Sequence, residues 1–526
     1  MKILVPEPLS EKGLEIMRGA DGIEVDFRPD ATPEELRHAI ADCHALVIRS
    51  RTKVNADLLA RALNLKVIGR AGVGIDNVDV EEATRRGIIV MNSPEGNTIS
   101  TCELTMAMIL GLSRRIAEAS ASTRKGEWDR KRFAGMELMN KKLGIVGLGR
   151  IGGEVAARAA AFGMKIIGYD PFCTPDRAAK LQARLVPLKE LLRTADIITF
   201  HVPLTDETRG MIGPDEFRLM KKGVKIVNCA RGGIIDETAL CNAIRSGIVS
   251  GCGLDVYENE PPVGCPLPLL DSVISTPHIG AITAEAQANV ATEIARQVID
   301  VLNGGPARNA VNLPMMDGEA FDGLRPYAAL AEKLGMLLVQ MMGRIGGKLS
   351  VSYCGEIAKK DLTPVTRSFL CGLLRPVLTQ PVNMVNAPAI ARERGIEITE
   401  IKSPAAEAYA SLITVEGKSG AKTTSVSGAL FADDQPRIVR IDGLDVDVAP
   451  QGPVLIVRNQ DKPGAISHIA SVLARSQVNI ARMTVGRDKP GGKAITVLNI
   501  DEPVRDNVLD EIKQLKIIKD VRLVQL

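Results

Sequence analysis

The most informative segment of the chain is Leu143-Gly144-Ile145-Val146-Gly147-Leu148-Gly149-Arg150-Ile151-Gly152. Its apolar start predicts a buried strand, three glycines spaced as G-x-G-x-x-G follow, and helical spacing begins after them. In such a unit the first glycine allows a tight turn, the second lets the backbone approach a pyrophosphate, and the third lets helix and strand pack closely. The stretch therefore predicts a dinucleotide-binding α/β domain.

An acidic residue stands at the end of the next predicted strand, 165–169. Asp170 lies 18 residues beyond Gly152, and no arginine or lysine comes directly after it. A carboxylate at this place can accept hydrogen bonds from the ribose hydroxyls of NAD and repels the extra phosphate of NADP. The predicted cofactor is therefore NAD. The alternative explanation is a structural glycine turn followed by a surface aspartate.

Strands alternate with helical patterns on both sides of this loop. About six predicted strands between residues 143 and 275 match the strand count of a Rossmann fold. The first ninety residues repeat the alternation and predict a second parallel-sheet domain. Long helical patterns at 99–116 and 284–302 flank the glycine-loop unit. The predicted fold class is α/β, with two Rossmann-like doubly wound parallel sheets.

The pattern changes after residue 313. Residues 314–450 predict a mixed α/β region in which no catalytic motif is evident. A boundary follows at Gly452-Pro453. The segment 453–526 then alternates as strand, helix, strand, strand, helix and strand, which is the order of a ferredoxin-like domain.

Three further motifs follow predicted strands of the glycine-loop unit, where ligands bind in open parallel sheets. Hydride transfer at an alcohol carbon needs a proton acceptor, and an imidazole such as that of His278 suits this task at neutral pH. A carboxylate such as Glu260 can orient the imidazole and favour its charged form. Arg231 can hold a substrate carboxylate through two hydrogen bonds. Each residue alone has an ordinary structural explanation, but together with the glycine loop they favour an NAD-dependent dehydrogenase.

Composition excludes several other classes of function. The chain has 526 residues, a net charge of +3 and 25% charged residues, which argues against nucleic acid as the main partner. It contains no run of ~18 apolar residues that could span a membrane. Nine scattered cysteines without a CxxC pair indicate reduced thiols and a cytoplasmic protein. The five histidines lack metal-ligand spacing, so no metal is predicted.

These motifs resemble the D-isomer-specific 2-hydroxyacid dehydrogenase family. The residues that carry the resemblance are the glycine loop, Arg231 in Asn-Cys-Ala-Arg-Gly-Gly, Glu260, and His278 in Pro-His-Ile-Gly-Ala. It implies a discontinuous substrate-binding domain, 1–97 and 283–313, with an NAD-binding domain, 98–282, inserted into it. It also implies catalytic roles for Arg231, Glu260 and His278. The cofactor contacts that it implies are Val73, Gly147, Gly149, Arg150, Ile151, Gly152, Asp170, Val202, Cys229, Ala230, Asp255, Gly280 and Ala281.

Within that family, the segments 49–54, 69–79 and 126–133 and the long C-terminal extension resemble the members that oxidise 3-phosphoglycerate in serine biosynthesis. That substrate carries a carboxylate and a phosphate, so its pocket needs cations at both ends. The implied substrate contacts are Arg49, Lys53, Arg70, Gly72, Gly74, Asn97 and Arg130, the last reaching in from a partner subunit. The alternative, ordinary solvated basic residues, applies most to Arg51, Lys131 and Arg132.

The segment 453–526 resembles an ACT domain, a module that binds small amino acids at a paired interface. The resemblance implies an L-serine effector held by Asn459, Asp461 and Asn479, and a homo-oligomer, a tetramer rather than a dimer. Relatives often carry a ring side chain at position 459. The alternative is a purely structural pairing module, and 314–450 resembles the intervening domain of long-form enzymes.

Two other functions stay open at this point. One is reduction of an unphosphorylated acid such as glyoxylate or hydroxypyruvate. The basic residues Arg49, Lys53 and Arg70 argue against this as the main role, with 2-oxoglutarate reduction as an accessory activity. The other is a catalytically silent NAD-sensing, corepressor-like protein, against which the intact catalytic residues weigh.

Overall fold

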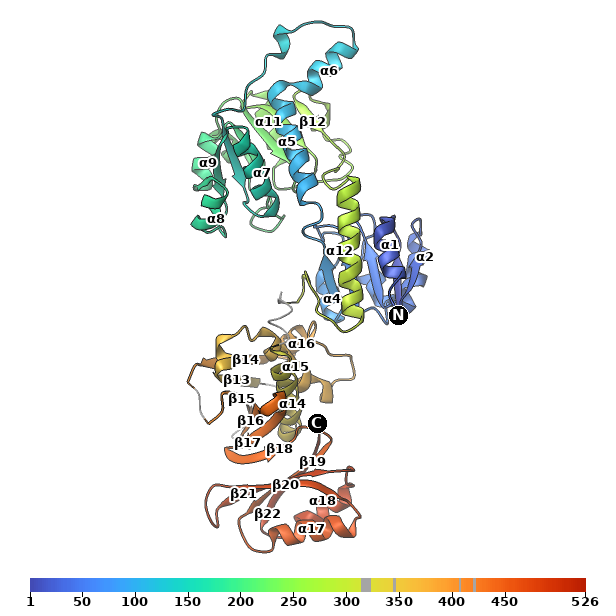
Figure 1. Cartoon of the computed structure of the whole chain (residues 1–526), viewed down its shortest axis with the longest axis vertical. Coiled ribbons are helices and arrows are strands. Elements are labelled where there is room, and N and C mark those ends of the chain that lie inside the picture. The colour runs from blue at the N-terminus through green and yellow to red at the C-terminus, as the bar shows by residue number, and fades with distance from the viewer. Residues whose placement is uncertain (314–322, 344–346, 406–407, 420–421) are drawn as a thin grey trace.

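The computed structural model describes residues 1–313, 323–343, 347–405, 408–419 and 422–526. Four β-sheets follow one another along the long axis of the molecule (Figure 1). The sheet of the glycine loop lies at one end and the C-terminal sheet at the other. The N-terminal sheet and the third sheet lie between them. Among the described residues, no helix has the length and apolar character needed to cross a membrane.

The N-terminal sheet is fully parallel, with the order β2-β1-β3-β4-β5. Its strands are β1 (Lys2–Val5), β2 (Glu24–Phe27), β3 (Ala45–Ile48), β4 (Val67–Arg70) and β5 (Ile89–Asn92), and its helices are α1 (Glu11–Arg18), α2 (Pro33–Ala39), α3 (Ala56–Arg61) and α4 (Val80–Arg85). Strand β2 was not predicted, because this edge strand is only partly buried and its apolar signal is weak.

Helix α12 (Ala284–Leu302) returns to this sheet from far along the chain and packs against α1 and β4. Gly69 on β4 allows this close approach, because a Cβ there would lie 2.7 Å from Val298 and 2.8 Å from Ile294. The N-terminal core therefore contains residues from both ends of the first three hundred positions.

The second sheet is also fully parallel, with the order β12-β11-β10-β9-β6-β7-β8. Its strands are β6 (Lys142–Val146), β7 (Lys165–Tyr169), β8 (Ala183–Leu185), β9 (Ile197–Phe200), β10 (Val224–Asn228), β11 (Val249–Leu254) and β12 (Val273–Ser275). Helices cover both faces: α5 (Thr98–Arg114), α7 (Arg150–Ala161) and α8 (Pro175–Lys180) on one, and α9 (Leu188–Thr194), α10 (Pro214–Leu219) and α11 (Glu237–Arg245) on the other.

Two details of this domain differ from the sequence prediction. The sheet has seven strands rather than about six, because the three-residue edge strand β8 is too short to give a periodic signal. The long helical pattern at 99–116 breaks at Arg115, whose left-handed φ of 51° ends α5 and begins α6 (Ile116–Arg124).

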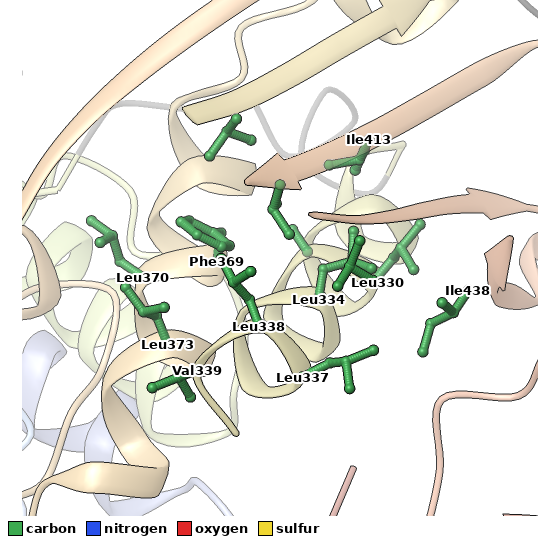
Figure 2. Packing of buried hydrophobic residues seen from close by; sticks show 14 of the residues in the cluster. Leu330, Leu334, Leu337, Leu338, Val339, Phe369, Leu370, Leu373, Ile413 and Ile438 are labelled. Atoms are coloured by element: carbon green, nitrogen blue, oxygen red, sulfur yellow. The ribbon is translucent and has the colours of Figure 1, made fainter. Parts of the chain in front are cut away.

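The third sheet is mixed, with the order β14-β13-β15-β16-β17-β18. Its strands are β13 (Gly347–Gly355), β14 (Ile396–Ser403), β15 (Ser411–Ser419), β16 (Lys422–Leu430), β17 (Pro436–Ile441) and β18 (Leu444–Val448), and its helices are α14 (Arg325–Met342), α15 (Thr363–Leu374) and α16 (Ala387–Glu393). Figure 2 shows the centre of its core, where leucines of α14 meet Phe369 of α15 and Ile413 and Ile438 of the sheet.

The C-terminal sheet is antiparallel, with the order β20-β21-β19-β22, and the predicted ferredoxin-like arrangement is confirmed. Its elements are β19 (Pro453–Gln460), α17 (Ala465–Arg475), β20 (Ile480–Arg487), β21 (Lys493–Ile500), α18 (Asp506–Lys513) and β22 (Ile518–Gln525). One face packs on α17 and α18. The other face contributes Val454, Ile456 and Val524 to the core of the third sheet, so the two C-terminal sheets form one packed unit.

Candidate active site

The structure brings Arg231, Glu260 and His278 together at the carboxyl ends of neighbouring strands. Arg231 follows β10, Glu260 lies in the loop after β11, and His278 follows β12. Nδ1 of His278 lies 2.7 Å from Oε2 of Glu260, and Oε1 of Glu260 accepts a hydrogen bond from the backbone N–H of Tyr257 at 3.2 Å. Because the carboxylate engages Nδ1, the imidazole is left with Nε2 to exchange a proton with a ligand.

The charge state of Glu260 follows from these contacts. Burial raises the pKa of this carboxyl, but the hydrogen bond and charge of His278, the backbone N–H of Tyr257 and the charge of Arg231 together hold the pKa below its ordinary value. Glu260 is therefore ionised at neutral pH and can stabilise an imidazolium.

The turn that carries His278 is held by a buried carboxylate. Asp255, which is 1% exposed, accepts hydrogen bonds from the backbone N–H groups of Ile279 at 2.7 Å and Gly280 at 2.8 Å. It also accepts one from the hydroxyl of Thr276 at 2.6 Å. His278 itself has a φ of 54°, a left-handed conformation that non-glycine residues seldom adopt. Asp255, predicted as a cofactor contact, thus fixes the turn that carries His278.

Two adjoining cavities are lined by residues of both the first and the second domain. The larger, about 690 Å³, is lined by Arg231, Glu260 and His278, and by Lys53, Arg70, Gly74 and Asn97 of the predicted substrate contacts. The smaller, about 470 Å³, begins at the glycine loop with Arg150 and Ile151. Its other lining residues include these predicted cofactor contacts: Val73, Val202, Cys229, Ala230, Asp255, Gly280 and Ala281. Arg231 and His278 line both cavities and therefore stand where a substrate and a cofactor would meet.

The glycine loop fits a dinucleotide. Gly147 has a φ of 94°, and a Cβ there would lie 2.4 Å from the carbonyl oxygen of His201. A Cβ on Gly152 would lie 2.0 Å from the carbonyl oxygen of Gly147, so helix α7 could not approach the strand. Gly149 faces open space, which leaves the backbone and the helix N-terminus accessible to a pyrophosphate. These glycines do not line the smaller cavity but form the turn beside it.

Asp170 also lies at this loop. One carboxylate oxygen accepts a hydrogen bond from the backbone N–H of Leu148 at 2.8 Å, and the other accepts one from Phe172 at 2.8 Å. The acid is thus fixed at the end of β7, next to the glycine turn, where a ribose of the cofactor would lie.

The larger cavity has a cationic wall. Burial, and then the nearby charge of Arg231, lower the pKa of Arg70 to about 10, so this guanidinium remains protonated at neutral pH. Its Nε and the Oδ1 of Asn97 are buried without a hydrogen-bond partner among the described residues. The two guanidinium charges and the unpartnered N–H of Arg70 favour an anionic ligand, because an anion would offset the repulsion between the charges and accept a hydrogen bond from that N–H.

Glycines make room for both arginines. A Cβ on Gly72 would lie 1.7 Å from Nη1 of Arg70, and a Cβ on Gly74 would lie 2.0 Å from Nη2 of Arg231. Nε of Arg231 lies 3.2 Å from Oδ2 of Asp76, an ion pair that links the two domains across the cleft. The two predicted glycines therefore act by giving the guanidinium groups space.

Three predicted substrate contacts, Arg49, Gly72 and Arg130, do not line either cavity in one chain. The side chain of Arg49 donates to the carbonyl of Pro8 at 3.4 Å, although its charge contributes to the lowered pKa of Arg70. Arg130 is exposed in the segment after α6, which projects from the far end of the second domain (Figure 1). Its expected approach from a partner subunit stays a prediction.

Sequence reasoning missed several residues of the cleft. Asp76 and Asn77 line the larger cavity, and His201 lines the smaller one. Burial lowers the pKa of His201 to about 3, so this imidazole is neutral. His201 directly follows β9, so the strand-end criterion that found Arg231 and His278 could have found it as well.

The three predicted effector residues do not converge in one chain. Asp461 accepts hydrogen bonds from Arg487 at 2.9 Å and from the backbone of Gly491 at 3.0 Å. Asn479 donates to Asp501 at 2.7 Å. Arg487, the partner of Asp461, ends β20, and Asn479 precedes this strand. At the usual rise of a strand, Arg487 and Asn479 lie about 25 Å apart, so Asp461 and Asn479 are at opposite ends of β20. Only Asn459, which is buried, lines the neighbouring cavity of about 1130 Å³.

Three family models match parts of this chain. Residues 106–280 match the D-isomer specific 2-hydroxyacid dehydrogenase NAD binding domain. Residues 323–442 match the D-3-phosphoglycerate dehydrogenase intervening domain, and residues 453–516 match the ACT domain.

Similar curated proteins and solved structures agree with these family matches. The curated D-3-phosphoglycerate dehydrogenase of Methanocaldococcus jannaschii is 46% identical over 100% of both chains, and that of Archaeoglobus fulgidus is 44% identical over 100% of both. Among solved structures, the D-lactate dehydrogenase of Aquifex aeolicus, complexed with NAD and lactic acid, is 29% identical with a TM-score of 0.54. That match covers 60% of this chain and 100% of the other.

Proposed function

The chain belongs to the family of D-3-phosphoglycerate dehydrogenases, and we propose that its cleft oxidises 3-phospho-D-glycerate to 3-phosphohydroxypyruvate with NAD. This reaction is the first step of the phosphorylated route to L-serine. The observation that carries the proposal is the larger cavity, in which Arg70 and Arg231 face a space that His278 also lines. The two cations match the two anionic groups of the substrate.

The catalytic residues have separate tasks in this scheme. Arg231 holds the substrate carboxylate, which places the hydroxyl-bearing carbon between His278 and the glycine-loop cavity. Bound NAD supplies the hydride acceptor. Nε2 of His278 takes the hydroxyl proton as the C–H bond gives up its hydride and the C=O bond forms. Glu260 stabilises the imidazolium through the 2.7 Å contact to Nδ1.

NADH formation from 3-phospho-D-glycerate, compared with NADH consumption on glyoxylate and hydroxypyruvate, tests this proposal. A folded chain that binds NAD but gives no NADH from 3-phospho-D-glycerate would contradict it. Full-length relatives at 46% and 44% identity are dehydrogenases, so a catalytically silent NAD sensor is not retained. Reduction of 2-oxoglutarate stays a prediction for the same substrate panel.

Replacing Arg70 with alanine is expected to weaken phosphate recognition selectively. In the reverse reaction, the KM for 3-phosphohydroxypyruvate should rise by about 30-fold or more, because a desolvated charge pair with the phosphate is lost. The KM for hydroxypyruvate, which carries no phosphate, should change by less than about threefold. Steady-state kinetics on the two substrates checks this. Equal effects on both would refute a contact between Arg70 and the phosphate.

For the chain as a whole we propose four domains: 1–97 with 283–313, then 98–282, 314–450 and 453–526. The packing of α12 on α1 and β4 supports the discontinuous first domain, while residues 314–322 lie outside the described part. We also propose that the protein is cytoplasmic and forms a homotetramer. The nine cysteines, all free thiols, support the cytoplasmic location. Sedimentation of the purified chain would measure the oligomer.

L-Serine is the effector that we propose for the C-terminal domain. Because Asp461 and Asn479 lie at opposite ends of β20, a site containing both requires two copies of the domain. Replacing Asp461 with alanine should raise the serine concentration for half-inhibition by about tenfold or more, since a charged contact is lost, with uninhibited kcat unchanged. The exposed Asp510, changed to asparagine, is the matched control. Unaltered inhibition in the Asp461 variant would place the effector elsewhere.

A further inference from the structure

A buried carboxylate lies beneath the cationic wall of the larger cavity. Glu7 follows β1, between Pro6 and Pro8, and is 4% exposed. Its two oxygens accept hydrogen bonds from three backbone N–H groups: those of Arg49 at 3.1 Å, Arg51 at 3.1 Å and Thr52 at 2.8 Å. A buried charge is costly unless it is well hydrogen-bonded, and here three donors satisfy it. Glu7 therefore fixes the backbone at 49–52.

An asparagine braces the same segment from the other side. Nδ2 of Asn77 donates to the carbonyl oxygens of Arg49 at 2.8 Å and Thr52 at 2.7 Å. The backbone of Asn77 also accepts a hydrogen bond from the N–H of Val54 at 2.8 Å. Glu7 thus holds the N–H groups of this segment while Asn77 holds its carbonyl groups.

The braced segment, residues 49–54, carries basic side chains toward the substrate space. Lys53 lines the larger cavity beside Arg70, and Arg49 is close enough to lower the pKa of Arg70. The side chain of Arg51 instead donates to the carbonyls of Pro6 and Pro29 and ties the segment back to the domain. Neither Glu7 nor the Asn77 amide contacts Arg231, Glu260 or His278 in the hydrogen bonds of the described residues.

We propose that Glu7 and Asn77 are positioning residues that hold segment 49–54 so that the cavity prefers a phosphorylated substrate over an unphosphorylated one. This rests on the proposed function, because the phosphate must lie at the Lys53 and Arg70 end of the cavity. The bracing acts before the substrate arrives. A segment already held in its binding conformation loses less conformational freedom when the phosphate binds.

Changing Glu7 to glutamine tests the proposal with nearly unchanged side-chain volume. The amide NH₂ cannot accept a hydrogen bond, so at least one backbone N–H loses its partner and the segment shifts. The KM for 3-phosphohydroxypyruvate should rise by about tenfold or more, with kcat within about threefold, and the kcat/KM for hydroxypyruvate should change by less than about threefold. Competitive inhibition by inorganic phosphate should weaken in parallel.

Asn77→Ser is the second variant, and it should give the same selective rise because it loses the two side-chain bonds while its backbone bond remains. If Glu7→Gln does not fold, Asn77→Ser tests the proposal in its place. Glu11→Gln, which changes an exposed carboxylate on α1, is the matched control. Equal losses for both substrates, or an unchanged KM for 3-phosphohydroxypyruvate, would overturn the inference. Absence of activity of the unaltered chain on phosphorylated substrates would instead overturn the proposed function.

Discussion

Replacing His278 with alanine is expected to lower kcat by about 10²- to 10⁴-fold while the affinity for NAD stays near that of the unaltered chain. Among the described residues, His278 is the only histidine that lines the larger cavity, and Glu260 Oε2 lies 2.7 Å from its Nδ1. Without it, the hydroxyl proton has no positioned acceptor as the hydride leaves. Stopped-flow measurement of NADH formation gives kcat, and titration of protein fluorescence with NAD gives the affinity.

Glu260→Gln is the companion variant to His278→Ala. It keeps a hydrogen-bonding side chain beside Nδ1 but removes the charge that stabilises the imidazolium, so it should lose less activity than His278→Ala. Parallel loss of kcat and NAD affinity in His278→Ala would show a structural role and contradict the acid–base assignment.

The contribution of Glu260 to the stability of the fold is expected to depend on pH. Its folded pKa lies below its ordinary value, so the carboxylate stabilises the fold above the unfolded pKa. That contribution is lost as pH falls through the lower, folded pKa. Between neutral pH and the ordinary glutamate range, the carboxylate therefore stays charged beside His278.

The second large effect is expected for Arg231→Ala. The kcat/KM should fall by about 10³-fold, because a desolvated charge that grips the substrate carboxylate typically contributes several kcal/mol. The loss should be similar for 3-phosphohydroxypyruvate and hydroxypyruvate, since both carry the carboxylate. This separates Arg231 from Arg70, whose loss should affect only the phosphorylated substrate. The same two-substrate kinetics measures both variants.

Arg231→Lys serves as the matched control for charge. Lysine keeps a cation but lacks the planar fork that binds a carboxylate through two hydrogen bonds, so activity should lie between that of the alanine variant and the unaltered chain. Full activity of Arg231→Lys would contradict bidentate binding. A loss confined to 3-phosphohydroxypyruvate would place Arg231 at the phosphate instead.

Much of the fold was accessible from local patterns. The buried strands β6 and β9 and the long helix α12 stand close to their predicted positions, because their apolar periodicity is strong. Strands β2 and β8 escaped prediction because edge strands bury fewer residues and give a weaker pattern. The break at Arg115 has no glycine or proline to announce it.

Some residues of the candidate site were likewise predicted from the sequence, and others were missed. His278, Glu260 and Arg231 were predicted because each follows a strand, and parallel strands end at one edge of their sheet. Asp76 and Asn77 were missed because they lie in a loop of the other domain, and their importance comes from contacts with Arg231 and with segment 49–54. The buried Glu7 gives no sequence signal at all, since its three partners lie more than 40 positions away.

Local sequence was enough to predict the dinucleotide loop, an NAD-selecting role for Asp170, and the residue types needed for hydride transfer. These depend on spacing within one strand–loop–helix unit, where geometry is local. Three features became visible in the folded chain alone: the burial of Arg70 near Arg231, the hydrogen bonds of Glu7 to segment 49–54, and the separation of Asp461 from Asn479 within one chain. Those features arise where distant segments pack together, and burial, charge and distance at such contacts have no counterpart in local sequence order.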